Sequence, residues 1–203
     1  MPISPVHSLS FSHTQYDGTQ GPFALVANCG DSRLVTDDGI ATSPNTFRAV
    51  TRDHRPHDPI ERVRLRDCHA TVGAASNNKV LRVFPGGLAT SRSIGDIGMS
   101  TAIVPTPDIY IMPLTEPEMS GEKNGCTSCC RTQRFVLASD GLWDYVNNET
   151  VGRLAARDKR SSKDAATRLL KHCLKHGGNR DDVTIMVVDV TTNTTKAISE
   201  NDV

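Results

Sequence analysis

The pattern of apolar and polar positions divides the chain into strands and helices in a mixed order. Short apolar runs that end at Gly, Asp or Ser predict strands over residues 23–29, 33–36 and 134–139. Longer stretches with apolar residues three and four positions apart predict helices over about 148–157 and 162–176. Because the two kinds of element do not alternate strictly, the order favours an α+β fold, with β-sheets covered by helices.

Local signals indicate where several of these elements begin and end. Gly30-Asp31-Ser32 separates the first two apolar runs and indicates a hairpin turn. Asp58 followed by Pro59 is an N-cap with proline at the first helical position, so a helix is expected to begin there. The last run, 183–190, is β-branched and almost continuously apolar, which is typical of a strand buried on both faces.

One domain accounts for most of the 203 residues. Residues 1–20 are polar and show no sustained period, so we expect a flexible leader, followed by the domain over 21–190. Residues 116–132 are polar and rich in cysteine, which predicts an insertion loop within that domain. The Thr- and Asn-rich segment 191–203 is expected to be a flexible tail.

Charge and hydropathy exclude several kinds of partner. The 23 basic and 23 acidic residues cancel, so the sequence predicts no nucleic-acid partner. No apolar run approaches the roughly 20 residues that cross a bilayer, and the N-terminus lacks the order of a signal peptide. We therefore expect no membrane association and a cytoplasmic or nuclear location, while the oligomeric state stays undetermined.

Three of the six cysteines, Cys126, Cys129 and Cys130, crowd one segment. A tetrahedral zinc site needs four ligands, and no second Cys or His pair lies at short spacing nearby. A variable loop with reduced, incidental thiols is the favoured interpretation, and a zinc-binding module is the alternative. The alternative requires stoichiometric zinc and an effect of Cys→Ser substitutions on thermal stability.

Four aspartates follow predicted strands or turns, namely Asp31, Asp140, Asp144 and Asp181. Carboxylates at strand ends can converge on one cleft, and Mg²⁺ and Mn²⁺ prefer such oxygen ligands. Aspartate is also a common turn residue, because its side chain bonds to nearby backbone N–H groups. The pattern alone leaves both interpretations open for each of the four.

Five motifs together resemble the metal-dependent protein serine/threonine phosphatases, the PPM or type 2C family. They are Gly30-Asp31-Ser32-Arg33, Asp53-His54-Arg55-Pro56, the segment Gly86-Gly87-Leu88-Ala89-Thr90-Ser91-Arg92-Ser93-Ile94-Gly95-Asp96, Ser139-Asp140-Gly141-Leu142-Trp143-Asp144, and Asn179-Arg180-Asp181-Asp182. The resemblance covers about residues 21–190. It implies a β-sandwich of two antiparallel sheets flanked by helices, with a binuclear Mg²⁺ or Mn²⁺ centre at one end.

The resemblance also implies an activity and a set of metal ligands. The activity is hydrolysis of phosphoserine and phosphothreonine in phosphoprotein substrates by a metal-activated water. Asp140 and Asp181 match ligands of the metal centre and would act in catalysis through it. Asp31 and Asp144 resemble positions that help to bind a further, weaker metal in the same cleft.

Other motif residues are expected to support this site rather than to bind metal. Arg92 and Asp96 would form an ion pair or shape a flap beside the cleft, and Gly141 lies within the Ser-Asp-Gly motif. Trp143 is expected to pack in the core. His54 titrates near neutrality when unperturbed, but the resemblance implies a structural role for it.

One departure from the family pattern changes the expectation about activity. The family's first metal-binding segment, Asp-Gly-His-Gly-Gly, is absent, and Asp17-Gly18-Thr19-Gln20 is the nearest upstream sequence to it. The chain therefore resembles the C-terminal two-thirds of the domain. It is interpreted either as an N-terminally incomplete phosphatase or as an inactive pseudophosphatase that binds phosphoproteins or regulates them.

Overall fold

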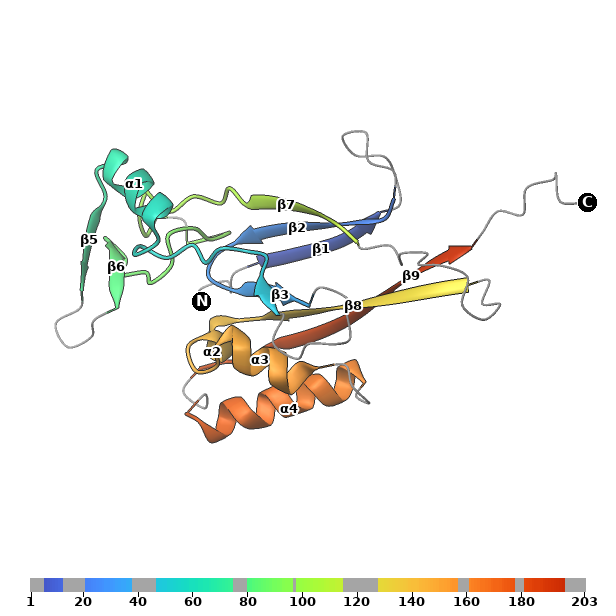
Figure 1. Cartoon of the computed structure of the whole chain (residues 1–203). Helices are drawn as coiled ribbons and strands as arrows, with labels where there is room; N and C mark the ends of the chain where they lie inside the picture. The colour runs from blue at the N-terminus through green and yellow to red at the C-terminus, as the bar shows by residue number, and fades with distance from the viewer. Residues whose placement is uncertain are drawn as a thin grey trace, which may run out of the picture.

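The protein folds into two antiparallel sheets that face each other, with helices on the outer face of one sheet (Figure 1). The computed structural model describes residues 6–12, 21–37, 47–74, 80–96, 98–114, 128–156, 161–177 and 181–195. Within these ranges no helix is long and apolar enough to cross a membrane.

The two large sheets contain seven of the strands. The first has the order β1-β2-β7, made of β1 (Val6–Ser12), β2 (Phe23–Cys29) and β7 (Asp108–Pro113). The second has the order β4-β3-β8-β9, made of β4 (Arg48–Ala49), β3 (Arg33–Thr36), β8 (Ser128–Ala138) and β9 (Ile185–Thr195). A separate hairpin pairs β5 (Thr71–Ala74) with β6 (Leu81–Phe84).

The described residues also form four helices. They are α1 (Pro59–Asp67), α2 (Asp140–Trp143), α3 (Asn148–Ala155) and α4 (Ser162–Lys175). Asp58 caps α1 as expected, because its carboxylate accepts hydrogen bonds from the backbone N–H groups of Ile60 and Glu61. Ser161 and Asp164 form a reciprocal capping box at the start of α4.

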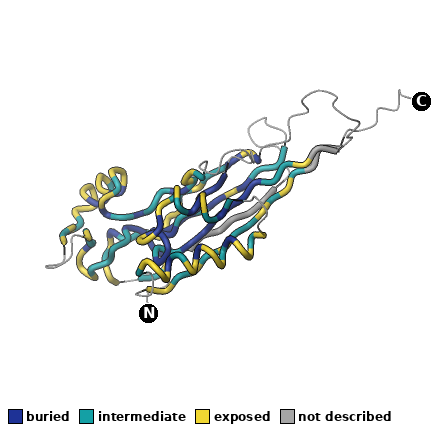
Figure 2. Tube along the Cα trace, turned by 60° about the horizontal axis from the view of Figure 1, so that its bottom comes forward, coloured by how far each residue is buried: buried dark blue, intermediate teal, exposed yellow. Residues whose placement is uncertain are grey.

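The apolar core has two main layers, which Figure 2 shows as the buried inner stretches of the trace. Between the sheets, Ala24 and Val26 of β2 point inward while Leu25 is partly exposed, the period of two that a half-buried strand requires. Between the second sheet and the helices, Leu169 of α4 and Val151 of α3 are fully buried. Burial of each such side chain contributes about 1.5–3 kcal/mol.

Two sequence expectations about strands are wrong. The Gly30-Asp31-Ser32 turn does not make a hairpin, because β2 pairs with β1 and β7 whereas β3 pairs with β4 and β8. The turn instead carries the chain from one sheet to the other. The last strand is not buried on both faces, since it lies at the edge of its sheet and Met186 is 57% exposed.

Strands also occupy parts of three segments expected to be flexible or to form a loop. β1 lies inside the segment expected to be a leader, where Ser8-Leu9-Ser10-Phe11-Ser12 alternates polar and apolar residues. β8 begins inside the expected insertion loop, and β9 continues into the expected tail. Residues 13–20, 115–127 and 196–203 lie outside the described residues, so those parts of the boundary predictions stay predictions.

Candidate active site

The crossing between the two sheets positions Asp31. Gly30 has φ +121°, a left-handed conformation that favours glycine, and its N–H donates to Nδ1 of His54 at 3.1 Å. Beyond the turn, Arg33 donates to both carboxylate oxygens of Asp53 at 2.9 and 2.7 Å. These contacts tie the crossing to the loop before α1, and the Asp31 side chain is left only 6% exposed.

The end of β8 positions Asp140 and Asp144. Asp140 is the first residue of the short helix α2, and Asp144 follows its last residue. Trp143 is buried, and its Nε1–H donates to the carbonyl of Ala138 at 2.7 Å, which holds the helix against the strand. The expectation that Trp143 packs in the core is therefore confirmed.

A close backbone approach at Gly141 brings Asp181 to the same place. A Cβ atom at Gly141 would lie 2.4 Å from the carbonyl oxygen of Asp182, so the approach requires glycine. Ser139 strengthens it, because its hydroxyl donates to that carbonyl at 3.1 Å and accepts from the N–H of Thr184 at 3.1 Å. The expected support by Gly141 thus has a steric basis: it lets the segment with Asp181 lie against α2.

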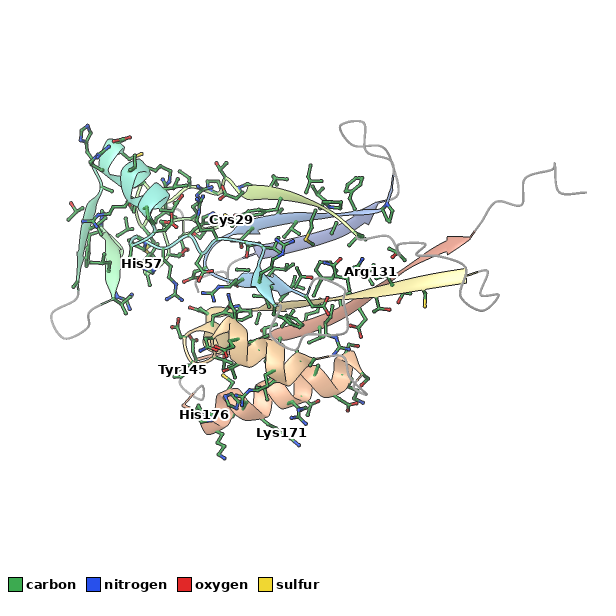
Figure 3. All side chains as sticks on the ribbon, in the orientation of Figure 1. Cys29, His57, Arg131, Tyr145, Lys171 and His176 are labelled. Carbon is green, nitrogen blue, oxygen red and sulfur yellow. The ribbon has the colours of Figure 1, made fainter. Side chains whose placement is uncertain are left out.

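Three of the four expected carboxylates converge on one guanidinium, that of Arg55. Arg55 Nη2 lies 2.9 Å from Oδ1 of Asp144 and 3.7 Å from Oδ2 of Asp140, and its Nε lies 3.1 Å from Oδ2 of Asp31. Two residues labelled in Figure 3 help to locate this site. Cys29 is the last residue of β2 and precedes Asp31 along the chain, and Tyr145 follows Asp144 after α2.

The carboxylates of this group together carry more negative charge than Arg55 offsets. We name the group the acidic cluster; it consists of Asp31, Asp140, Asp144 and Asp181. Burial raises the pKa of Asp31 to about 6, although Arg55 acts in the opposite direction and Asp140 adds to the rise. Burial also raises the pKa of Asp140, and the neighbouring charge of Asp181 raises it further. Asp181 therefore acts on Asp140 electrostatically, and the carbonyl of its neighbour Asp182 lies against Gly141, so the segment with Asp181 belongs to the same end of the molecule as Asp140.

The acidic cluster fits a hard divalent cation by its chemistry. Its donors are all carboxylate oxygens, and their mutual repulsion is relieved by added positive charge. Its geometry is not yet that of a bound ion, because in the described part of the chain no three His, Cys, Asp or Glu side chains are grouped closely enough to hold a metal. The guanidinium of Arg55 lies between the carboxylates instead.

Arg92 lies in a second, separate group of charges, here named the Glu61 hub (Glu61, Arg64, Ser91, Arg92 and Asp108). Nε of Arg92 donates to Glu61 at 3.0 Å, and its Nη1 donates to Asp108 at 2.8 Å. Arg92 therefore pairs with Glu61 and Asp108 and not with Asp96, which accepts a hydrogen bond from Ser93 at 2.7 Å. The hub fixes the flap segment around Arg92 to α1 and to β7.

His54 has the surroundings of a structural residue. Its ring is fully buried, Nδ1 accepts from Gly30, and Nε2 lies 3.2 Å from Asp108. Burial lowers the pKa of His54, so the neutral ring with its proton on Nε2 suits both contacts. His54 therefore links the Gly30 crossing to the Glu61 hub.

The cysteine cluster lies only partly within the described residues. Cys126 is outside them, so the zinc interpretation stays a prediction, whereas Cys129 and Cys130 lie in β8 and not in a loop. Cys29, Cys68, Cys130 and Cys173 are free. His172 of α4 and His176, the C-cap residue of that helix, face each other with ring centroids 4.3 Å apart.

The sequence assigns no role to four residues of these groups. Arg55 lies within a motif without an assigned role, and Glu61, Arg64 and Asp108 are not distinguished by the pattern. Glu61 falls on the helix predicted from its cap and Asp108 starts a strand, positions where a charged residue usually faces solvent. The residues that pair with them come from distant segments, so local pattern carries no signal for them.

Comparison with known proteins identifies the family. The family model described as Protein phosphatase 2C matches residues 11–182. The chain belongs to the protein phosphatase 2C family. The expected family and its α+β fold are thereby confirmed.

Curated relatives and solved structures agree with this assignment. The chain is 34% identical over 172 residues to Probable protein phosphatase 2C 5 of Arabidopsis thaliana, covering 81% of this chain and 35% of the relative. It is 37% identical over 166 residues to Probable protein phosphatase 2C 74 of Oryza sativa subsp. japonica, covering 81% and 36%. The chain thus spans about a third of the length of the relatives it matches.

Solved structures show the same fold at lower sequence identity. A serine-threonine phosphatase 2C from Toxoplasma gondii superposes with a TM-score of 0.61 at 24% identity, over 84% of this chain and 55% of that one. A sex-determining protein of C. elegans gives a TM-score of 0.61 at 23% identity, over 81% and 36%. The mixed fold of antiparallel sheets and helices is therefore that of the family.

Proposed function

We propose that this chain forms part of a protein serine/threonine phosphatase in which the acidic cluster binds Mg²⁺ or Mn²⁺ and phosphoserine or phosphothreonine is hydrolysed. The observation that carries the proposal is the convergence of Asp31, Asp140 and Asp144 on Arg55, with Asp181 beside Asp140. Family membership supports the reaction class, since a phosphatase of this family acts on phosphoproteins.

The proposed ligand roles are those that the family resemblance implies for the four aspartates. Asp140 and Asp181 would hold the ions of a binuclear centre, while Asp31 and Asp144 would bind a further ion. Such ions supply a water of lowered pKa and offset the negative charge that develops on the phosphoryl oxygens. The rigid supports at Gly30, Gly141 and Trp143 keep the carboxylates in place.

A groove beside the acidic cluster offers room for the residues that flank a phosphorylated side chain. It encloses about 590 Å³ and is lined by Arg33, Trp143, Asp144, Tyr145, Val146, Asn147, Asn148 and Glu149. Its lining is mainly polar, with amide side chains able to bond to a peptide backbone. We propose that the substrate chain lies along this groove while its phosphoryl group faces Asp140.

The test is hydrolysis of a phosphothreonine peptide by the 203-residue chain, with and without millimolar Mn²⁺. We expect Mn²⁺-dependent phosphate release that Asp140→Ala abolishes and Asp67→Ala, an exposed substitution on α1, leaves unchanged. Folded protein that releases no phosphate would refute the activity for this chain. Binding of the phosphopeptide without turnover would then favour the alternative, a pseudophosphatase, which the absence of an Asp-Gly-His sequence motivates.

A further inference from the structure

Arg55 occupies the space that the carboxylates of the acidic cluster would give to a cation. Its guanidinium contacts Asp31 on one side and Asp144 on the other, and reaches towards Asp140. Asp31 and Asp144 are also the carboxylates expected to bind a divalent ion, and Arg55 contacts one oxygen of each. A guanidinium and a metal ion cannot occupy the same space between Asp31 and Asp144. In addition, the two positive charges repel each other at that distance.

The contacts of Arg55 are incomplete on the Asp31 side. Nη2 donates a well-formed hydrogen bond of 2.9 Å to Asp144. Nε is buried 3.1 Å from Asp31 but, among the described residues, makes no hydrogen bond of acceptable geometry. Since a buried donor without an aligned acceptor is costly, little hydrogen-bond energy opposes withdrawal of the guanidinium from Asp31.

The position of Arg55 in the chain allows such a withdrawal. It belongs to the loop before α1, where its N–H bonds to the carbonyl of Asp53, and its side chain keeps 16% of its surface exposed. The backbone on either side is anchored, with His54 buried and Asp58 capping α1. The long side chain can therefore turn towards solvent about its own torsions without disturbing the loop.

We propose that Arg55 is a built-in counter-ion that competes with a divalent cation for Asp31 and Asp144 and so sets the affinity of the acidic cluster. The inference rests on the proposed function, because it needs the acidic cluster to bind a cation. Without the cation, the guanidinium holds the carboxylates together against their repulsion. When a cation binds, the guanidinium leaves Asp31, where its Nε makes no well-aligned hydrogen bond among the described residues.

The opposite role for Arg55 predicts the opposite result. If the guanidinium serves to preorganise the carboxylates for the ion, its removal lets them separate and weakens binding. If it competes with the ion, removal of one positive charge about 5 Å from a divalent ion strengthens binding by about tenfold, even with water-like screening. The sign of the change in affinity therefore distinguishes the two.

The experiment is calorimetric titration of Mn²⁺ into the unsubstituted chain, Arg55→Gln and Arg55→Lys, after removal of metal with EDTA. Arg55→Gln is expected to bind Mn²⁺ about tenfold more tightly. Arg55→Lys keeps the charge but cannot span both carboxylates, so an intermediate affinity is expected. Arg52→Gln is the matched control, since it removes a guanidinium from the same loop that pairs with Asp108 outside the acidic cluster.

Each outcome decides the question. The inference is supported if Arg55→Gln binds Mn²⁺ about tenfold more tightly than the unsubstituted chain. It is also supported if Arg55→Gln binds Mn²⁺ and the unsubstituted chain does not. Unchanged or weaker binding by Arg55→Gln overturns it, and so does an equal gain in Arg52→Gln, which would make the effect one of general charge. Should Arg55→Gln fail to fold, Arg55→Lys gives the same sign of change and the same decision.

The proposed function can fail separately. Loss of Mn²⁺ binding in Asp140→Ala together with no gain in Arg55→Gln keeps the cation site and rejects competition by Arg55. Mn²⁺ binding that neither substitution changes rejects the acidic cluster as the site, and the inference about Arg55 falls with it.

Discussion

The acidic cluster and the Glu61 hub are built from the same residue types, but their charges are balanced in opposite ways. In the hub, Glu61 accepts from Arg64, Ser91 and Arg92 on both carboxylate oxygens. In the acidic cluster, Asp31, Asp140 and Asp144 share the guanidinium of Arg55, and Asp181 adds a fourth negative charge that acts on Asp140. A site with complete partners serves the fold, whereas a site with surplus negative charge is suited to bind a cation.

The effect on ionisation shows the contrast directly. Glu61 is fully buried, yet its hydrogen bonds to Arg92, Ser91 and Arg64 outweigh desolvation and lower its pKa to about 2. Asp31 is also buried, and desolvation, which its one imperfect cationic partner does not offset, raises its pKa to about 6. Burial acts in the same direction on both, so the number and quality of the partners decide the sign.

The largest expected effect is on the hub. Glu61→Gln removes the charge that faces Arg64 and Arg92, which leaves Arg64 without the carboxylate that it pairs with and Arg92 with Asp108 alone. We expect a loss of about 3–5 kcal/mol in the free energy of unfolding, measured by urea denaturation. Asp67→Asn, an exposed change on the same helix, should cost less than about 0.5 kcal/mol. A loss of similar size in both would show that the hub contributes nothing particular.

The second effect is the acid dependence of the hub. Because folding lowers the pKa of Glu61 from 4.5 to about 2, the stabilisation is present above pH 4.5 and is lost as the pH falls towards 2. The loss attributable to this group amounts to about 3 kcal/mol. Stability curves from urea melts between pH 5 and 2.5 should therefore be steeper for the unsubstituted chain than for Glu61→Gln. Parallel curves would remove Glu61 as the cause.

A smaller effect is expected where Gly141 supports the acidic cluster. Gly141→Ala drives a methyl group into the backbone carbonyl of Asp182, which costs about 1–3 kcal/mol and moves Asp181 away from Asp140. We expect weaker Mn²⁺ binding as well as a lower thermal midpoint. Gly73→Ala, where the nearest neighbour lies 3.9 Å away, provides the control. Unchanged Mn²⁺ affinity in Gly141→Ala would contradict the proposed place of Asp181 in the site.

Local pattern predicted the elements better than it predicted their partners. The helix from Asp58 and the last long helix were recognisable from caps and period. The pairing of β2 and β3 was not, because a Gly-Asp-Ser turn has the same composition whether it closes a hairpin or crosses between sheets. The edge position of β9 was equally hidden, since apolar content does not record how many neighbours a strand has.

The residues of the candidate site also differ in how well the sequence predicts them. The four aspartates were found because they follow strands and match motifs, and the structure brings them together. Arg55 could not be assigned from the sequence, because its role depends on carboxylates 24 positions before it and 89 positions after it. A side chain that acts through tertiary contacts of this kind leaves no periodic signal.

The most direct test of the acidic cluster as a cation site is a crystal of the chain grown with MnCl₂, with anomalous scattering recorded at the manganese edge. We expect an anomalous peak among Asp31, Asp140, Asp144 and Asp181, with the Arg55 guanidinium turned away from Asp31. A manganese peak elsewhere, such as against His172 and His176, or an Arg55 that still bridges Asp31 and Asp144 with no manganese beside them, would contradict this expectation.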